Sequence, residues 1–157
     1  MKVLFIGGTG IISSACSALA VERGIELTLL NRGQTTTRPV PDGANVVVGD
    51  IRKPASVESA LGDRTFDVVV DWVAYTPEHV DADLEYFRGR TGQYVFISSA
   101  SAYHKPVRSL PITESTPLHN PFWAYSRNKA ACERRLMRAY REEGFPVTVV
   151  RPSHTYD

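Results

Sequence analysis

Three residues have the side-chain types for proton transfer beside a hydroxylated ligand: Ser99, Tyr125 and Lys129. Tyr125 and Lys129 are four positions apart, so on a helix they lie on one face. A neighbouring ammonium favours the ionised phenol and should lower the pKa of Tyr125, which would let the phenol exchange a proton at a carbon–oxygen bond. Ser99 follows an apolar run, and its hydroxyl would orient the substrate oxygen. This spacing of tyrosine and lysine is common by chance on solvated helix faces. The catalytic interpretation is favoured because the pair follows a strand end and a glycine turn.

The glycine turn lies between the first apolar run and the first stretch with helical spacing. A dinucleotide-binding loop belongs there, because a sharp, bare backbone lets a pyrophosphate reach the N–H groups and the positive dipole end of the following helix. Ser13 replaces the third glycine of the usual pattern, at a position that serves close packing of helix and strand. The alternative is a purely structural turn. The candidate cofactor-binding residues are Gly7, Gly8, Thr9, Gly10, Ile11 and Ile12.

The end of the second apolar run is where such a loop expects an acidic residue for the ribose hydroxyls. Asn31 and Arg32 stand there instead. Asparagine can bond a hydroxyl without repelling a 2′-phosphate, and arginine can pair with that phosphate. The cofactor would therefore be NAD or NADP. These residues can also be read as a simple turn with Gly33.

Short apolar runs alternate with longer amphipathic stretches. Runs that are apolar at every position are typical of strands in a parallel sheet covered by helices. The alternation predicts an α/β fold, a Rossmann-like doubly wound parallel sheet in three α/β/α layers, over residues 1–157. The expected strands are Val3–Ile6, Ile25–Leu30, Val46–Val48, Val68–Val70, Tyr94–Ile97 and Val147–Val150. The expected helices lie near Ser13–Arg23, Ala55–Leu61, Pro77–Arg88 and Pro121–Glu143, with surface loops over Gln34–Gly43 and His104–Asn120.

Length and composition fit one globular domain, with 157 residues of which 43% are hydrophobic and 22% charged. A formal net charge of +1 argues against nucleic acid as a partner, because phosphate-backbone binding needs a basic excess. Two cysteines are too few for a disulfide framework. No apolar run approaches the ~20 residues that span a bilayer. We therefore expect a cytoplasmic protein with no membrane partner.

Weaker signals have structural explanations. His79, Asp81 and Asp83 have metal-ligating side chains, but residues two apart do not share a helix face, so no metal site is expected. Trp72 and Trp123 can stack on a ligand or pack in the core. Arginines interleaved with glutamates over residues 133–143 favour a solvated, salt-bridged helix face over a nucleic-acid patch.

Taken together, these motifs resemble the extended short-chain dehydrogenase/reductase family, the NAD-dependent epimerase/dehydratase group, over the whole chain. Residues 7–13 match that family's Gly-Gly-x-Gly-Phe-Ile-Gly, with Ser13 departing, and residues 49–51 match Gly-Asp-(Ile/Leu). Residues 71–74 fall where the family has His-x-Ala-Ala, and only their location matches. Residues 96–103, 125–129 and 151–157 resemble Ser-Ser-x-x-Val-Tyr, Tyr-x-x-x-Lys and Arg-Pro-x-x-x-Tyr-Gly.

The resemblance implies roles for the matched residues. Tyr125 would be the acid/base, Lys129 would lower its pKa and bind the nicotinamide ribose, and Ser99, less plausibly Ser101, would hold the substrate hydroxyl. Asp50 would contact the adenine. The remaining implied cofactor contacts are Ile51, Val73 and Ala74.

The family acts mostly on nucleotide sugars as epimerases, dehydratases and reductases, with hydride transfer between a sugar carbon and the nicotinamide. Its members are considerably longer and carry a C-terminal substrate domain, so the resemblance implies that these residues are the cofactor-binding half. A homodimer through the helices near Pro77–Arg88 and Pro121–Glu143 is also implied. Two alternatives remain open: a non-catalytic dinucleotide-binding or RNA-binding regulatory relative of the same fold, and an inactive piece of an enzyme.

Overall fold

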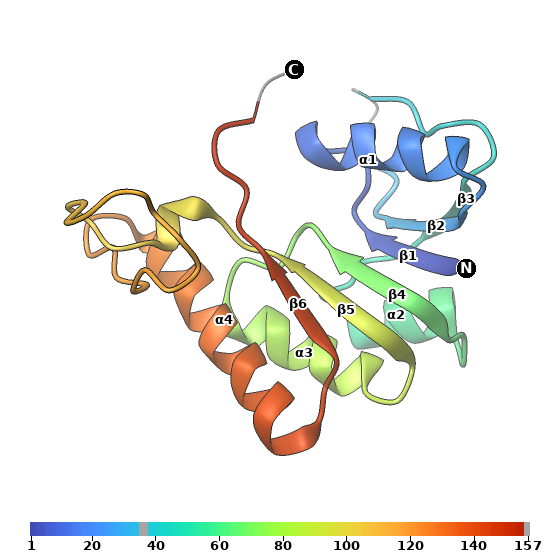
Figure 1. The fold of residues 1–157 in the computed structure, drawn as a ribbon. Coiled ribbons are helices and arrows are strands. Elements are labelled where there is room, and N and C mark those ends of the chain that lie inside the picture. Colours follow the sequence, from blue (N-terminus) through green and yellow to red (C-terminus); the bar gives the residue numbers. More distant parts are fainter. Residues whose placement is uncertain (35–37, 156–157) are drawn as a thin grey trace.

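The computed structural model describes residues 1–34 and 38–155. Its strands form a single six-stranded sheet in the order β3-β2-β1-β4-β5-β6, with every neighbouring pair parallel (Figure 1). The strands are β1 (Lys2–Ile6), β2 (Glu26–Asn31), β3 (Asn45–Val48), β4 (Phe66–Asp71), β5 (Thr91–Ile97) and β6 (Val147–Val150). The α-helices within the described residues are α1 (Ile11–Glu22), α2 (Pro54–Leu61), α3 (Pro77–Phe87) and α4 (Ala124–Glu143), with a short 3-10 helix η1 (Ala100–Ala102). The predicted Rossmann-like α/β fold is confirmed.

The first residues of α1, α2, α3 and α4 show how local contacts determine where a helix begins. α1 begins at Ile11, two residues before the predicted start, because Gly10 takes the N-cap position in an extended conformation. α2 and α3 both carry proline in the first turn, where its missing N–H costs nothing. α4 begins at Ala124 and not at the predicted Pro121. Its N-cap Trp123 is extended, and the Asn120 side chain accepts a hydrogen bond from the Phe122 N–H at 3.1 Å, which holds this segment outside the helix.

The hydrophobic core has two unequal parts, one on each face of the sheet. The larger part packs α2, α3 and α4 against the strands, and α3 and α4 contact each other. It includes Phe87 and Leu136, which are both fully buried. The smaller part packs α1 against Phe5, Leu27 and Leu29. Burial of each such side chain contributes about 1.5–3 kcal/mol.

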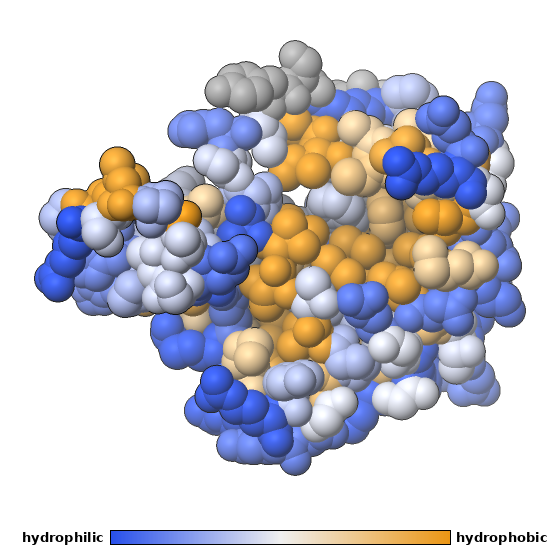
Figure 2. Space-filling view, viewed as in Figure 1, coloured by the Kyte–Doolittle hydropathy of each residue, from blue (hydrophilic) through white to orange (hydrophobic). Residues whose placement is uncertain are grey.

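The α1 face of the sheet is only partly covered. α1 lies over the β1 and β2 end, whereas the apolar side chains of β5 and β6 remain accessible (Figures 1 and 2). Val95 and Ile97 are half-buried, and Val150 is 42% exposed. Figure 2 shows apolar residues gathered across the middle of this face.

The described parts of the two predicted loops contain no α-helix or strand. Residues 104–120 form an irregular segment whose His104 and Lys105 N–H groups bond to the carbonyl oxygens of Pro117 and His119. For the loop predicted over residues 34–43, the structure shows irregular backbone at residues 34 and 38–43, and residues 35–37 lie outside the described residues.

Candidate active site and cofactor cradle

The candidate residues gather at the carboxyl-terminal edge of the sheet, where ligands bind in open α/β folds. The glycine turn follows β1, Asp71 ends β4, and Ser98 and Ser99 follow β5. Tyr125 lies in the first turn of α4. The fold therefore brings the predicted catalytic and cofactor residues to one edge.

The glycine turn is built for close approach to the N-terminus of α1. Gly7 and Gly8 have φ values of 101° and 118°, which side chains rarely allow. A Cβ at Gly8 would lie 2.7 Å from a Leu29 methyl, so this position admits only glycine. No described residue accepts a hydrogen bond from the backbone N–H groups that line the turn, which belong to Gly8, Thr9, Ile11 and Ile12. Free N–H donors on a bare turn fit a pyrophosphate.

Serine at position 13 keeps the helix close to the turn by its side chain. Ser13 is 3% exposed, and its Oγ accepts a hydrogen bond from the Gly10 N–H at 2.8 Å. One turn further, the buried Ser17 Oγ donates to the Gly8 carbonyl oxygen at 3.0 Å. The departure from the glycine pattern therefore preserves the shape of the turn, although it occupies the Gly10 N–H.

Asn31 and Arg32 lie next to this turn, as predicted. With its amide nitrogen as donor, Asn31 reaches the Gly7 carbonyl oxygen at 2.7 Å, so its amide braces the turn from β2. Arg32 is exposed, and no described residue forms an ion pair or hydrogen bond with its guanidinium. Asn31 thus has a structural partner, whereas Arg32 remains available to an anion.

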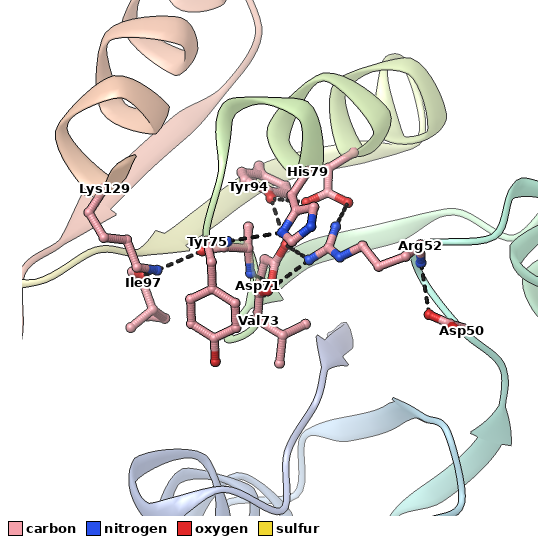
Figure 3. Close-up of polar contacts among 11 residues, drawn as sticks. Asp50, Arg52, Asp71, Val73, Tyr75, His79, Tyr94, Ile97 and Lys129 are labelled. Atoms are coloured by element: carbon pink, nitrogen blue, oxygen red, sulfur yellow. Dashed lines mark hydrogen bonds and ion pairs between the residues drawn. The ribbon is translucent and has the colours of Figure 1, made fainter. Parts of the chain in front are cut away.

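Asp50 begins a chain of polar contacts that crosses the site (Figure 3). Its Oδ1 accepts a hydrogen bond from the Arg52 N–H at 3.0 Å, while the Ile51 side chain packs against the larger core. The Arg52 guanidinium then reaches the turn after β4, where Nη2 donates to the Val73 carbonyl oxygen at 2.9 Å. Arg52 was not singled out from the sequence.

Asp71 organises the turn that carries Val73 and Ala74. It is fully buried, and its Oδ1 accepts hydrogen bonds from the Val73 and Ala74 N–H groups at 2.6 and 2.8 Å. Ala74 is also fully buried, and the Lys129 ammonium binds its carbonyl oxygen. A ligand can therefore contact the partly exposed Val73. It cannot contact the buried Ala74 side chain, and the Ala74 N–H and carbonyl oxygen already have hydrogen-bond partners.

Lys129 is buried, with 1% of its surface exposed. Its Nζ donates to the carbonyl oxygens of Ala74 and Ile97 at 2.6 and 2.7 Å (Figure 3). The rings of Phe96 and Tyr75 lie 4.7 and 4.9 Å from this nitrogen. Burial lowers the pKa of Lys129 to about 8, against the opposing charges of Asp71 and Glu133, while Arg52 adds to the decrease.

The predicted effect of Lys129 on Tyr125 is wrong in direction. Burial raises the pKa of Tyr125, the neighbouring Tyr75 raises it further, and a hydrogen bond with the Ser99 side chain acts against both. The Lys129 Nζ lies 5.7 Å from the Tyr125 ring centroid, and its hydrogen bonds go to the two carbonyl oxygens. Tyr125 is therefore a protonated phenol near neutral pH. Its ring lies against Trp123 and Tyr75, with centroid separations of 4.8 and 6.3 Å.

Ser99 belongs to a hydrogen-bonded group of hydroxyls that the sequence did not reveal. Its Oγ donates to Ser101 Oγ at 2.9 Å, and Ser126 Oγ donates to the same oxygen at 2.9 Å. The Asn120 amide reaches the Ser101 carbonyl oxygen at 2.8 Å and so ties the irregular 104–120 segment to the site. Ser99 and Tyr125 are thus brought together, with Ser101 behind them.

Comparison with known proteins decides the family. The model of the NAD dependent epimerase/dehydratase family matches residues 3–156. The chain belongs to this family. The UDP-glucose 4-epimerase of Lactobacillus helveticus is 34% identical over 169 aligned residues, which cover 96% of this chain and 51% of that protein. The chain spans about half the length of the curated relatives it matches.

Two further proteins are similar to this chain. The chloroplast stem-loop binding protein of 41 kDa b of Arabidopsis thaliana is 28% identical, over 99% of this chain and 42% of its own length. The crystal structure of the Thermus thermophilus UDP-glucose 4-epimerase in complex with NAD superimposes with a TM-score of 0.80 at 26% identity, covering 96% of this chain and 54% of that one. The family is therefore supported by both sequence and fold.

Behind the family's Tyr-x-x-x-Lys motif lies a buried ion pair. Glu133, one helical turn after Lys129, is 2% exposed, so it is not on the solvated helix face predicted for it. It accepts hydrogen bonds from Ser98 Oγ and from the Arg151 guanidinium, whose Nη2 lies 2.6 Å from Oε2. Arg151 also donates to the Tyr103 hydroxyl at 2.9 Å. The Arg-Pro segment of the family thereby fixes the strand end that presents Ser99.

Other predicted features of this family member have structural places. Trp72 packs edge-on against Phe5 with a centroid separation of 5.4 Å, in the smaller core, whereas Trp123 is 55% exposed beside Tyr125. Arg135 of α4 forms an ion pair with Asp81 of α3, a contact between helices that the sequence did not predict. Among residues 1–34 and 38–155, no cluster of three or more potential metal ligands occurs. Within the same residues, no helix is long and apolar enough to cross a membrane.

Proposed function

We propose that the chain binds NAD or NADP at the glycine turn and forms the cofactor-binding and proton-transfer half of an enzyme that epimerises a UDP-sugar. The observation that carries this proposal is the juxtaposition of free N–H donors at the α1 N-terminus with Ser99, Tyr125 and Lys129 at one sheet edge. The 34% identity to a UDP-glucose 4-epimerase supports the substrate class.

In this function, separate residues of the chain would transfer the proton, orient the substrate and bind the cofactor. When bound, the nicotinamide supplies a two-electron acceptor and donor next to the sugar carbon. As a phenolate, formed once the phenol has released its own proton to solvent, Tyr125 takes the proton of the sugar hydroxyl as that carbon is oxidised and returns it on reduction. Ser99, whose hydroxyl follows β5 at the same sheet edge, orients the same hydroxyl. An ammonium has three N–H donors and two of those on Lys129 are bound to carbonyl oxygens, so the third can hold a cofactor ribose hydroxyl.

The choice between NAD and NADP rests on Arg32. NAD is favoured by the family and by the NAD complex of the Thermus relative. The exposed Arg32 has no ion pair among the described residues and could pair with a 2′-phosphate. We propose NAD as the principal cofactor, with NADP tolerated through Arg32.

The test has two stages. Titration of the chain with NADH and NADPH, followed by nicotinamide fluorescence, measures binding. Addition of UDP-glucose or UDP-galactose to the NAD-loaded chain, followed by sugar analysis, measures turnover. Saturable binding supports the cofactor site, and its absence contradicts the proposal. Binding without turnover limits the chain to the cofactor-binding part of the function.

A second candidate function is RNA binding, which an arginine stripe on α4 favours. Arg134, Arg138 and Arg141 line a groove of about 390 Å³ with Leu118 and Met137. No described residue forms an ion pair or hydrogen bond with these three guanidinium groups, because Glu133 pairs with Arg151, and Glu143 with Arg88 and Arg135. The stem-loop binding relative is 28% identical to this chain.

Fluorescence polarisation with a stem-loop RNA at several salt concentrations tests this candidate. RNA binding predicts that replacing the three arginines by alanine weakens the complex and reduces the salt slope by about 3. An Arg23→Ala, Lys53→Ala, Arg64→Ala triple variant is the matched control for charge, because these three side chains are exposed and lie outside the stripe. Equal polarisation for all three proteins contradicts RNA binding through this stripe.

A further inference from the structure

The direction of the Lys129 ammonium depends on a turn that lacks regular secondary structure. One of its two acceptors, the Ile97 carbonyl, belongs to β5 and is held by the sheet. The other, the Ala74 carbonyl, lies between β4 and α3, outside any helix or strand. The direction of the third N–H of Lys129, which the proposed function assigns to a cofactor ribose hydroxyl, therefore depends on a further contact that fixes Ala74.

Asp71 supplies that contact. Its Oδ1 accepts the N–H groups of both Val73 and Ala74, at 2.6 and 2.8 Å. A carboxylate that accepts two backbone N–H groups makes charge-assisted bonds, which are stronger than bonds between neutral groups. Asp71 thus closes the turn from its first residue and sets the place of the Ala74 carbonyl.

Asp71 is itself held from the other side of the site. Its Oδ2 accepts a hydrogen bond from the Tyr94 hydroxyl at 3.2 Å and lies 3.8 Å from Arg52 Nη2 (Figure 3). The same Arg52 nitrogen donates to the Val73 carbonyl oxygen, and the Arg52 N–H donates to Asp50. The second buried carboxyl, Asp83, lies 2.8 Å from the Tyr94 hydroxyl oxygen and 3.4 Å from Arg52 Nη1, but it has no bond to the turn.

We propose that Asp71 is a positioning residue for Lys129: it fixes the turn whose Ala74 carbonyl directs the ammonium, and Arg52 clamps it from the adenine side. This inference rests on the proposed function and deepens it, because it joins the predicted adenine contact, Asp50, to the predicted ribose contact, Lys129. A negative charge inside the turn has a second effect, since it also stabilises the buried ammonium.

The charge and the hydrogen bonds of Asp71 can be separated by variants. Asp71→Asn keeps an oxygen acceptor for the turn and removes the charge. Asp83→Asn is the matched control, because it changes the other carboxyl of the same buried group and leaves both turn bonds intact. The chain has four lysines, so the Lys129 side chain can be followed by NMR with ¹³Cε-labelled lysine and assigned with Lys129→Arg.

We expect the pKa of Lys129, about 8 in the parent chain, to fall by about one pH unit in Asp71→Asn and to stay unchanged in Asp83→Asn. This decrease measures the electrostatic contribution of Asp71. The positioning role is read from the Val73 and Ala74 amide resonances, which should shift in Asp71→Asn and keep their parent values in Asp83→Asn. An unchanged value in folded Asp71→Asn, or an equal decrease in both variants, overturns the proposal.

A measurement on the parent chain covers the case in which Asp71→Asn does not fold. Because Lys129 binds the Ala74 carbonyl, the amide resonances of Val73 and Ala74 should shift in step with the Lys129 titration. Amides that stay constant through that pH range overturn the proposal. Titration with NADH is run separately on the same samples, so a failure to bind cofactor counts against the proposed function and not against this coupling.

Discussion

Tyr125 lies against Trp123, with the two ring centroids 4.8 Å apart and the planes inclined by 39°. Trp123 is the extended N-cap of α4 and is itself 55% exposed, so it covers Tyr125 from the solvent side. This cover contributes to the burial that keeps Tyr125 protonated. Trp123, two positions before the tyrosine of the family's motif, thus contributes to the raised pKa of the phenol.

Replacing Trp123 by alanine should bring the pKa of Tyr125 back toward 10.0, because it exposes the phenol to water. The measurement is an NMR titration with ¹³Cζ-labelled tyrosine, in which Tyr125→Phe assigns the resonance. Phe122→Ala, which removes a ring that is 76% exposed one residue earlier, is the control and should leave the pKa unchanged. A Tyr125 titration that is the same in parent and Trp123→Ala would contradict this role.

Binding of NADH should weaken as pH rises through the Lys129 pKa of about 8. Burial has lowered this pKa from 10.5, so the ammonium loses its proton, and with it a donor for the ribose, well before an exposed lysine would. The dissociation constant should rise about tenfold between about pH 7 and pH 9. Lys129→Met should bind weakly at every pH. A flat profile for the parent chain would show that the ammonium is not used.

Gly10→Ala should weaken NADH binding by at least about tenfold, because its methyl group enters the cradle that a pyrophosphate must approach. The φ of Gly10 is −82°, which alanine accepts, and the nearest atom to the new Cβ is Ser13 Oγ at 3.2 Å. Gly89→Ala is the control. It lies at the opposite edge of the sheet with φ of +73°, so it should lower stability by about 1 kcal/mol and leave binding intact. Equal affinities for parent and Gly10→Ala would place the cofactor elsewhere.

Arg32→Ala should reduce the affinity for NADPH by about tenfold and change the affinity for NADH little, because only the 2′-phosphate offers a charge to the guanidinium. Competitive titration of both cofactors against parent and variant gives the ratio directly. If both affinities fall together, Arg32 serves the loop and not the phosphate.

Asp83→Asn should stabilise the chain increasingly as pH rises from about 4 to about 7. Burial and the Asp71 carboxylate raise the pKa of Asp83 well above 3.8, so the folded chain keeps a proton that the unfolded chain releases. The unfolded state then binds fewer protons, and the free energy of unfolding falls with pH between 3.8 and the native pKa. Asparagine needs no proton and removes this loss. Urea unfolding of both proteins at the two pH values measures the difference, which must grow with pH.

The sequence predicts the sheet and the cradle because both rest on local patterns. The apolar runs around Leu4 and Val69 form buried inner strands, and the glycines at positions 7 and 8 adopt the backbone that only they allow. Tyr125 and Lys129 share a helix at the expected spacing. For these features, residue type and spacing are sufficient.

The polar contacts behind the site depend on distances between segments far apart in the chain, so the sequence does not reveal them. Lys129 binds backbone carbonyls, and a carbonyl carries no residue signature. Arg52 and Asp71 come together only through folding, and the sequence marks neither as a partner of the other. The pKa of Tyr125 is raised and not lowered as predicted, because burial is the largest cause of the shift and the spacing of Tyr125 and Lys129 does not reveal burial.

The edge strand β6 should open more readily than the inner strands that carry the rest of the site. β6 pairs with β5 on one side only within the described sheet, and its Val150 is 42% exposed. Val147 and Val149 pack against the larger core, but the other face of this edge strand is uncovered, so its amides should exchange before those of the inner strands. Arg151 follows directly, and each detachment withdraws the counter-ion of Glu133 and loosens Ser98. Local opening of the edge strand β6 should therefore also loosen Ser99, the hydroxyl residue that follows Ser98.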